Sequence, residues 1–301
     1  MAAFLGLGLS CLLRSDDAGH SGLPTVRHCR ARSLSAAPAV ANARGARVRL
    51  CEGVRPVSIL QARAITKQFG GLLALSAVEL TIAAGEFVAV IGPNGAGKST
   101  LLNILTGLLM PDGGQVLFDG KDITRLATHK RVRSGLGRTF QHGRTFARLT
   151  VLENVMIGAA IRGDRTERAI RDAALAVLDQ MGLAAEANES IGSLSYGRRR
   201  MVELCRALAC EPRVLLLDEP AAGLNSGEVD QLVDRLTELR ARQQLTIVLI
   251  EHNMGMVMRL AERIAVLNFG RKIADGPPAQ VQADPAVLSA YLGHGYNRAS
   301  V

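Results

Sequence analysis

Aromatic residues are scarce in this chain: tryptophan is absent, and only three tyrosines and seven phenylalanines occur among 301 residues. Proteins that bind single-stranded nucleic acid without sequence preference stack the bases on aromatic side chains. The composition therefore argues against that class of protein, and we expect no nucleic acid partner.

Cysteine is also rare, with five residues in all and no C-x-x-C pair. Because the spacings that hold zinc are missing, the cysteines do not predict a metal site. Cys205 and Cys210 lie five positions apart on an expected helix and so do not share one face of it. We expect both to be small buried hydrophobic residues in a reducing compartment.

Long hydrophobic runs are missing as well. No run reaches the roughly 18 apolar residues that a membrane-spanning helix needs. The longest candidate, residues 1–13, is shorter and has no basic residue ahead of it, so it resembles a signal peptide only weakly. We expect a protein that is soluble, or peripheral to a membrane through a partner.

Positive charge is concentrated at the start of the chain. The net charge is +9, but residues 1–57 alone hold eight arginines against three acids, so the remainder is close to ordinary. Residues 1–57 are rich in Ala, Arg, Ser and Gly, show no sustained period, and are predicted to be disordered. They are either an organellar targeting segment or an upstream stretch added by a wrongly assigned start. We favour the second explanation, because a folded-domain pattern begins abruptly at Ser58.

The most informative stretch is the run 92–100, which matches G-x-x-x-x-G-K-[ST] and follows an apolar run at 87–91. Its glycines allow the backbone to approach phosphate oxygens closely. Lys98 would bridge the β- and γ-phosphates of a nucleotide, and the Ser99 hydroxyl would bind Mg²⁺. The alternative, a glycine-rich turn without a ligand, explains neither the lysine nor the hydroxyls. We predict a nucleotide-binding loop formed by Gly92, Pro93, Asn94, Gly95, Ala96, Gly97, Lys98, Ser99 and Thr100, which becomes an ATP-binding loop through the family resemblance described below.

Short segments of strand character surround this loop. They are bounded by glycine-rich turns and lie at residues 59–65, 78–82, 87–91 and 115–118. They predict a small β layer beside the phosphate loop. Phe69 ends the first of these segments. Its ring can stack on adenine, or it can be an ordinary strand-end hydrophobic residue, and the sequence favours neither alternative.

Strands and helices alternate in the second half of the chain. Strands are predicted at 214–217, 245–250 and 264–269, and helices at 227–242 and 285–292. This alternation predicts a mostly parallel sheet with helices on both faces.

A helical pattern occupies the middle of the chain. Apolar residues recur at spacings of three and four between 164 and 181, and Asp164 with Glu167 resembles a capping pair. The three arginines at 198–200 fall in the first turn of a further predicted helix, where they oppose the helix dipole. They are tolerated if solvated or if an anion lies nearby, and a solvated face is the commoner explanation.

Polar residues follow two of the predicted strands. Asp218, at the carboxyl end of one strand, can hold Mg²⁺ beside Ser99. Glu219 can orient and deprotonate the attacking water. His252 follows the next strand and can hydrogen-bond the γ-phosphate, although a lone histidine at a strand end is more often structural.

Taken in order, these motifs resemble the ATP-binding cassette ATPases over about residues 58–294. The stretch 194–197, Leu-Ser-Tyr-Gly, resembles that family's signature motif. The resemblance implies a head-to-tail dimer in which Ser195, Tyr196 and Gly197 contact the ATP that is bound by the partner. It also implies that Gln141 reaches Mg²⁺ or the attacking water, and that Asn225 lies in a loop crossing the dimer interface.

Three residues depart from the family pattern. Tyr196 replaces a common Gly, Arg198 a common Gln, and Asn225 a common Asp. These departures bear on the strength of contacts across the dimer and not on the fold.

Finer matches resemble the branched-chain amino acid importer subfamily. They lie at 138–141, 149–155, 194–197, 221–225, 250–253 and 266–293. The resemblance implies a second ATPase subunit, integral-membrane permease subunits, indirectly a periplasmic solute-binding protein, and a place at the cytoplasmic face of the inner membrane. Phe146 is either a dock for a helix of the membrane subunit or a core-facing residue.

The predicted architecture is an α/β fold: a phosphate-loop NTPase core, an antiparallel β layer and a short helical subdomain at about 142–210. A short tail, 295–301, is expected to follow it. The predicted function is ATP hydrolysis that drives branched-chain amino acid import, with ATP and Mg²⁺ as cofactors. The expected catalytic residues are Glu219, His252 and Gln141, and the expected metal ligands are Ser99, Gln141 and Asp218.

Three other functions remain open. They are import of another small solute such as urea, an amide or an aromatic acid, export, and a non-transport cassette function. The single phosphate loop and the short insert argue against the last of these.

Overall fold

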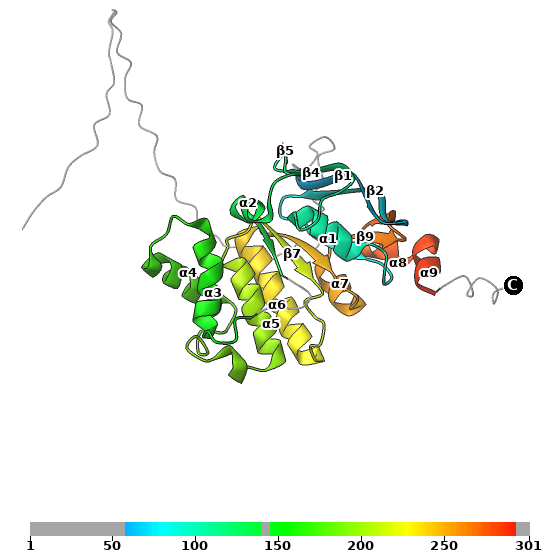
Figure 1. Cartoon of the computed structure of the whole chain (residues 1–301). Helices are drawn as coiled ribbons and strands as arrows, with labels where there is room; N and C mark the ends of the chain where they lie inside the picture. Colours follow the sequence, from blue (N-terminus) through cyan, green and yellow to red (C-terminus); the bar gives the residue numbers. More distant parts are fainter. Residues whose placement is uncertain (1–57, 140–144, 293–301) are drawn as a thin grey trace, which may run out of the picture. The chain divides into compact units, whose positions relative to one another are not determined.

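The computed structural model describes residues 58–139 and 145–292, which form two β-sheets with flanking helices (Figure 1). Gln141, the extension 1–57 and the tail 295–301 lie outside the described residues. The expectations for these parts therefore stay predictions.

Short apolar strands form the larger sheet, in which neighbouring strands follow the order β10-β9-β3-β8-β7-β6. All neighbours are parallel except β10, which is antiparallel to β9. Every residue of the strands β3, β7 and β8 is buried, as expected for parallel strands covered on both faces. The strands are β3 (Phe87–Ile91), β6 (Leu136–Arg138), β7 (Val214–Asp218), β8 (Thr246–Ile250), β9 (Arg263–Asn268) and β10 (Arg271–Gly276).

An antiparallel sheet forms a second layer, with the order β2-β1-β4-β5. Its strands are β1 (Ser58–Phe69), β2 (Leu72–Ala83), β4 (Gly113–Phe118) and β5 (Lys121–Asp122). The predicted strands are confirmed, but β1 and β2 are longer than the segments 59–65 and 78–82 that the alternation of apolar residues predicts. Ala64 and Ala77 have positive φ values of 49° and 48°, and the pairing register shifts between Ala62 and Ile65. This bulge interrupts the alternation without ending the strands.

The helices connect and cover the strands. They are α1 (Lys98–Thr106), α2 (Thr128–Arg133), α3 (Val151–Ala159), α4 (Glu167–Gln180), α5 (Tyr196–Leu208), α6 (Ser226–Gln243), α7 (Met254–Leu260), α8 (Pro278–Gln282) and α9 (Pro285–Leu292), with single 3₁₀ turns at Ala160–Arg162 and Ile191–Ser193. Helices α3, α4 and α5 pack against one another, inside the region where the helical subdomain is expected (Figure 1).

One capping prediction is wrong. Helix α4 is capped by Thr166 and not by Asp164, since Thr166 has an extended backbone and its hydroxyl accepts a hydrogen bond from the N–H of Ala169 at 3.3 Å. Asp164 lies too far upstream of the first helical N–H groups to cap them.

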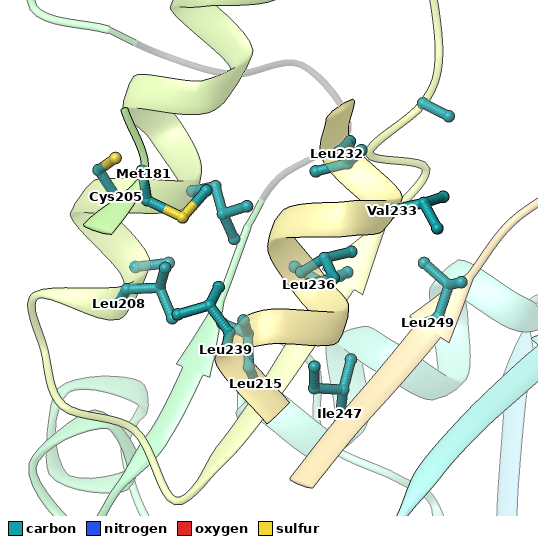
Figure 2. Packing of buried hydrophobic residues seen from close by; sticks show 14 of the residues in the cluster. Met181, Cys205, Leu208, Leu215, Leu232, Val233, Leu236, Leu239, Ile247 and Leu249 are labelled. Atoms are coloured by element: carbon teal, nitrogen blue, oxygen red, sulfur yellow. The ribbon is translucent and has the colours of Figure 1, made fainter. Parts of the chain in front are cut away.

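Two apolar cores occupy the two faces of the larger sheet. Val88 and Val90 of β3 join the core that contains the antiparallel sheet and α1, whereas Phe87, Ala89 and Ile91 join the core under helices α3 to α9. Figure 2 shows part of this second core, with Leu232, Val233, Leu236 and Leu239 of α6 beside Leu215 of β7 and Ile247 and Leu249 of β8. Because each face is covered, the carboxyl ends of β3, β7 and β8 are held at fixed relative positions.

Within the described ranges, none of the helices combines the length and the apolar composition that crossing a bilayer requires.

Candidate functional site

The phosphate loop joins β3 to α1, and two of its glycines have no substitute. Gly92 and Gly97 have φ values of 148° and 100°. A Cβ atom at Gly92 would lie 2.1 Å from the carbonyl oxygen of Leu267, and one at Gly97 would lie 2.7 Å from that of Ala74. Gly97 is also the N-cap of α1 and supplies no side chain to the first N–H groups of the helix. The loop is therefore a backbone cradle whose free donors suit an anion.

Lys98 is the buried cation of this loop. Its Nζ donates to the carbonyl oxygens of Gly92 and Pro93, at 2.8 and 3.0 Å. Burial lowers the pKa of Lys98, and the nearby charges of Glu219 and Asp218 oppose that effect. The amino group thus lies beside the acids at the end of β7, as the motif predicts.

Asp218 ends β7 and is buried. Its Oδ2 accepts a hydrogen bond from Arg138 Nη2 at 2.9 Å, while its Oδ1 is buried without a hydrogen-bond partner in the part of the chain that the structure describes. Burial raises the pKa of Asp218, and Arg138 counteracts this. Ser99 and Asp218 line one cavity of about 700 Å³. An unpartnered carboxylate oxygen and a serine hydroxyl in one cavity suit a hard cation such as Mg²⁺.

Glu219 and His252 are in direct contact. The Nε2 atom of His252 lies 2.9 Å from Oε1 of Glu219. Glu219 has a φ of 47°, a left-handed conformation that is uncommon for a non-glycine residue, and its N–H donates to the carbonyl oxygen of Ile250 at 2.9 Å. The carboxylate is therefore fixed by its backbone and by a histidine from the neighbouring strand end.

Glu251 is a supporting residue that the sequence analysis did not identify. It is buried, and its carboxylate accepts hydrogen bonds from the N–H groups of Ala221, His252 and Asn253, at 2.8, 2.9 and 3.1 Å. It thereby ties the loop after Glu219 to the segment that holds His252. The sequence signal that could have identified Glu251 is its position between a buried strand and His252.

The signature stretch forms the start of α5. Ser195 is the N-cap, and its hydroxyl accepts from the N–H of Arg198 at 3.3 Å. The hydroxyl of Tyr196 donates to the carbonyl oxygen of Ala222 at 3.3 Å. A Cβ at Gly223 would lie 2.8 Å from the Tyr196 ring. The tyrosine that departs from the family pattern is thus accommodated by a glycine in the facing loop.

The solvated face predicted for the three arginines is wrong for one of them. Arg198 is exposed and pairs with Glu186 at 3.3 Å. Arg200 is buried, pairs with Glu203 at 3.0 Å, and donates to the carbonyl oxygen of Glu219 at 3.3 Å. A carboxylate one helical turn away compensates the buried charge, so the alternative of a nearby anion applies to Arg200.

Asn225 is the last residue of its loop and the N-cap of α6. Its side chain accepts from the N–H of Glu228, and the Glu228 side chain accepts from the N–H of Asn225, both at 3.0 Å. Glu228 also lines a cavity of about 620 Å³ together with Ser195 and Gly197. That cavity is separate from the one lined by Ser99 and Asp218, so the structure does not bring the signature residues to this chain's own phosphate loop.

Phe69 and Phe146, for each of which the sequence leaves a binding role or a packing role open, are about half exposed. The exposed fractions are 47% for Phe69 and 48% for Phe146. The Lys67 amino group lies 5.5 Å from the Phe69 ring centroid, and the Arg206 guanidinium lies 5.5 Å from that of Phe146. Phe146 lines the 700 Å³ cavity and is half exposed, so it does not face the core, and docking to a partner stays a prediction. Gln141 lies outside the described residues.

Sequence comparisons identify relatives along most of the chain. Residues 75–222 match the family described as ABC transporter, and residues 271–297 match branched-chain amino acid ATP-binding cassette transporter. The high-affinity branched-chain amino acid transport ATP-binding protein BraF of Pseudomonas aeruginosa is 41% identical over 251 residues, covering 78% of this chain and 98% of BraF. LivG of Escherichia coli K12, which carries the same description, is 39% identical over 249 residues, with coverages of 78% and 98%.

A further relative has a different cargo. The lipopolysaccharide export system ATP-binding protein LptB of Haemophilus influenzae is 37% identical over 240 residues, covering 80% of this chain and 99% of LptB. Among solved structures, a nucleotide-free ATP-binding cassette from an ABC transporter has a TM-score of 0.72 and 32% identity, and it covers 78% of this chain and 99% of its own. The ADP conformation of the cassette MJ1267 has a TM-score of 0.71 and 33% identity, with the same coverages.

Proposed function

Since this chain belongs to the ATP-binding cassette transporter ATPases, we propose that it is the ATP-hydrolysing subunit of an importer for branched-chain amino acids. The contact between Glu219 and His252, at 2.9 Å, carries the hydrolytic part of the proposal because it fixes a carboxylate beside the phosphate loop. The match of residues 271–297 to the branched-chain family, together with BraF and LivG, supports the cargo.

Nucleotide binding rests on the phosphate loop. The N–H groups of the loop and the start of α1 would hold the β-phosphate, and Lys98 would exchange the carbonyl oxygens of Gly92 and Pro93 for phosphate oxygens. Phe69, exposed at the end of β1, is a candidate platform for the adenine ring.

Ser99 and Asp218 would hold Mg²⁺, with Gln141 as a further expected ligand. The bound ion neutralises charge on the β- and γ-phosphates during phosphoryl transfer. The residues of this chain fit a hard cation, because Oδ1 of Asp218 is a buried oxygen without a partner among the described residues.

Hydrolysis needs a base for the attacking water. Glu219 would take a proton from the water as its oxygen attacks the γ-phosphorus, and the bond to the β–γ bridging oxygen would break to leave ADP and phosphate. His252 would orient the Glu219 carboxylate and contact the γ-phosphate. Both side chains are already within hydrogen-bond distance of each other.

A second copy or a related subunit would complete the site. Ser195 and Gly197 line a cavity that does not include Ser99 or Asp218. This separation supports the proposal that they serve the nucleotide on the partner cassette. The proposed assembly also contains the permease subunits and, indirectly, the periplasmic binding protein. It places this chain at the cytoplasmic face of the inner membrane.

Uptake of labelled leucine, isoleucine and valine by cells that lack this gene and any paralogue tests the cargo. We expect uptake of all three to fall, to return with the wild-type gene, and to stay low with Lys98→Ala. Unchanged uptake of all three would remove the branched-chain assignment and leave a transporter ATPase of another solute. Because LptB is also similar, lipopolysaccharide export in the same strain is the matched second measurement.

A further inference from the structure

Arg138 lies at the end of β6 and connects three positions around the candidate metal site. Its side chain is only 9% exposed. Nη2 donates to Asp218 Oδ2 at 2.9 Å, and Nη1 donates to Asn103 Oδ1 at 2.7 Å and to Thr106 Oγ1 at 3.1 Å. One buried guanidinium therefore joins the end of β7 to helix α1.

Helix α1 is also the helix that presents Ser99. Asn103 follows Ser99 by four residues, so the two lie on the same face, one turn apart. Ser99, Asn103, Thr106, Arg138 and Asp218 all line the 700 Å³ cavity. Arg138 thus sets the position of the Asp218 carboxylate relative to the helix that carries the other candidate ligand.

The two oxygens of Asp218 are in different situations. Oδ2 is bound by Arg138, whereas Oδ1 is buried and has no hydrogen-bond partner among the described residues. The N–H of Asp218 is held separately by Thr139 Oγ1 at 3.3 Å, so the backbone at this position is also fixed. This leaves one carboxylate oxygen, in a defined orientation, unused by the protein.

We propose that Arg138 is a positioning residue for magnesium: it holds Oδ2 of Asp218 so that Oδ1 remains available to the ion and does not turn to pair with Lys98. This inference rests on the proposed function, which places Mg²⁺ between Ser99 and Asp218. A salt bridge that only stabilises the edge of the sheet is the competing explanation. That explanation gives no reason for the same guanidinium to bind two side chains of α1.

The test measures magnesium dependence of nucleotide binding and not turnover. Anisotropy of a fluorescent ATP analogue is recorded in EDTA and across a Mg²⁺ titration, for the wild type, Arg138→Met and Arg138→Lys. Loss of a residue that orients a metal ligand typically weakens metal affinity about 10–100-fold. We expect the Mg²⁺ concentration for half-maximal binding to rise by about that factor, with binding in EDTA unchanged.

A matched control comes from a second arginine–aspartate pair. Arg213 binds Asp119 at 3.0 Å, is about half exposed, and does not line the cavity. Arg213→Met should leave the magnesium titration unchanged. Asn103→Ala removes one hydrogen-bond acceptor of the Arg138 guanidinium. It should also raise the Mg²⁺ concentration for half-maximal binding, but by less than Arg138→Met. This variant keeps the proposal testable if Arg138→Met does not fold.

Asp218→Asn separates this inference from the proposed function. Suppose that Asp218→Asn weakens the magnesium response, while every Arg138 variant that folds leaves this response unchanged or strengthens it. The positioning role of Arg138 is then overturned, and the assignment of Asp218 to the metal site stands. If Asp218→Asn itself leaves the magnesium response unchanged, the metal site of the proposed function is wrong. Weakening by Arg138→Lys, with wild-type binding in EDTA, is the supporting result, because lysine keeps the charge and loses only the fork.

Discussion

At the scale of single residues, Glu219 combines an uncommon backbone conformation with a specific side-chain partner. Left-handed φ values in non-glycine residues are costly and often occur at functional sites. Glu219 is bound through its N–H by Ile250, through its carbonyl oxygen by Arg200, and through its carboxylate by His252. The surrounding structure therefore determines where the carboxylate lies before any nucleotide binds.

Glu219→Gln should reduce ATP turnover by about 10²–10⁴-fold, because the amide keeps the shape of the side chain and loses the base. ATP binding should survive, since Lys98 and the loop N–H groups supply it. Turnover and equilibrium binding of ATP measure the two effects separately. The control is Glu211→Gln, which changes an exposed acid with a similar φ of 50° away from the site. Near-normal turnover of Glu219→Gln would exclude it as the main base.

The two described cysteines should be unreactive in the folded protein. Burial raises the pKa of the Cys210 thiol to about 11, and that of Cys205 is raised further. Since the thiolate is the reactive species, alkylation at pH 7.5 should be far slower at these two positions than in denaturant. Peptide mass spectrometry after timed iodoacetamide treatment gives the rates at each residue. Rapid labelling of Cys210 under native conditions would show that its surroundings open readily.

At the scale of elements, the carboxyl end of α1 is bound by a fully buried arginine. Arg131 of α2 donates to the carbonyl oxygens of Ile104 and Leu105, at 2.8 Å each, and also to those of Thr124 and Leu126. Its guanidinium is a second donor to the carbonyl oxygen of Ile104, which also accepts from the N–H of Gly107 at 3.1 Å, and it supplies a donor to that of Leu105. Its charge suits the negative end of the helix dipole.

Arg131→Met should lower the free energy of unfolding by at least about 3 kcal/mol, because several buried carbonyls lose their donor at once. The comparison is Arg133→Met on the same helix, where an exposed guanidinium donates to the carbonyl oxygen of Ile161 at 3.1 Å. That change should stay within about 0.5 kcal/mol. Urea denaturation of both variants measures the difference. Equal, small effects would mean that water replaces the arginine at the end of α1.

Ser195→Arg tests whether the start of α5 serves a partner cassette. We expect turnover to fall by at least about 10²-fold, the usual loss when an anion donor is removed, while ATP binding to the isolated chain stays near normal. The substitution also removes a helix cap, which alone costs about 1 kcal/mol. Thr166→Arg removes the equivalent cap of α4 and should leave turnover unchanged. Equal loss of single-chain binding in Ser195→Arg would place its role in cis.

At the scale of the whole molecule, the sequence predicts the candidate catalytic residues at the strand ends better than the residues that hold them in position. Asp218, Glu219 and His252 are predicted because they follow apolar strands in the sequence, and the parallel pairing of β7 with β8 brings these strand ends together. The sequence does not identify Arg131 and Arg138 as residues that hold the site in place, because a single arginine usually indicates a surface position. The four atoms that accept hydrogen bonds from Arg131 are backbone carbonyl oxygens, which have no sequence signal. The lengths of β1 and β2 were missed for a related reason: bulges conceal their alternation.

Phe146→Ala should impair transport while the isolated subunit keeps its ATPase activity. Losing an aromatic anchor from an interface typically costs about 2 kcal/mol or more, roughly 30-fold in affinity. Assembly with the permease, measured by co-purification, and uptake of labelled leucine should both fall. Met258→Ala, at an exposed residue of α7, is the control for loss of surface hydrophobicity. Full uptake by Phe146→Ala would eliminate the docking role.

The order of strands in the larger sheet has a consequence for synthesis on the ribosome. β3, which leads into the phosphate loop, pairs with β8 on one side and β9 on the other. Both neighbours are translated long after it, since β9 ends at Asn268. At ~5–20 residues per second, the nascent β3 waits roughly 10–35 s for its partners. During that interval an apolar strand followed by a glycine-rich loop has neither of its sheet partners, which leaves Phe87–Ile91 open to pairing with other chains.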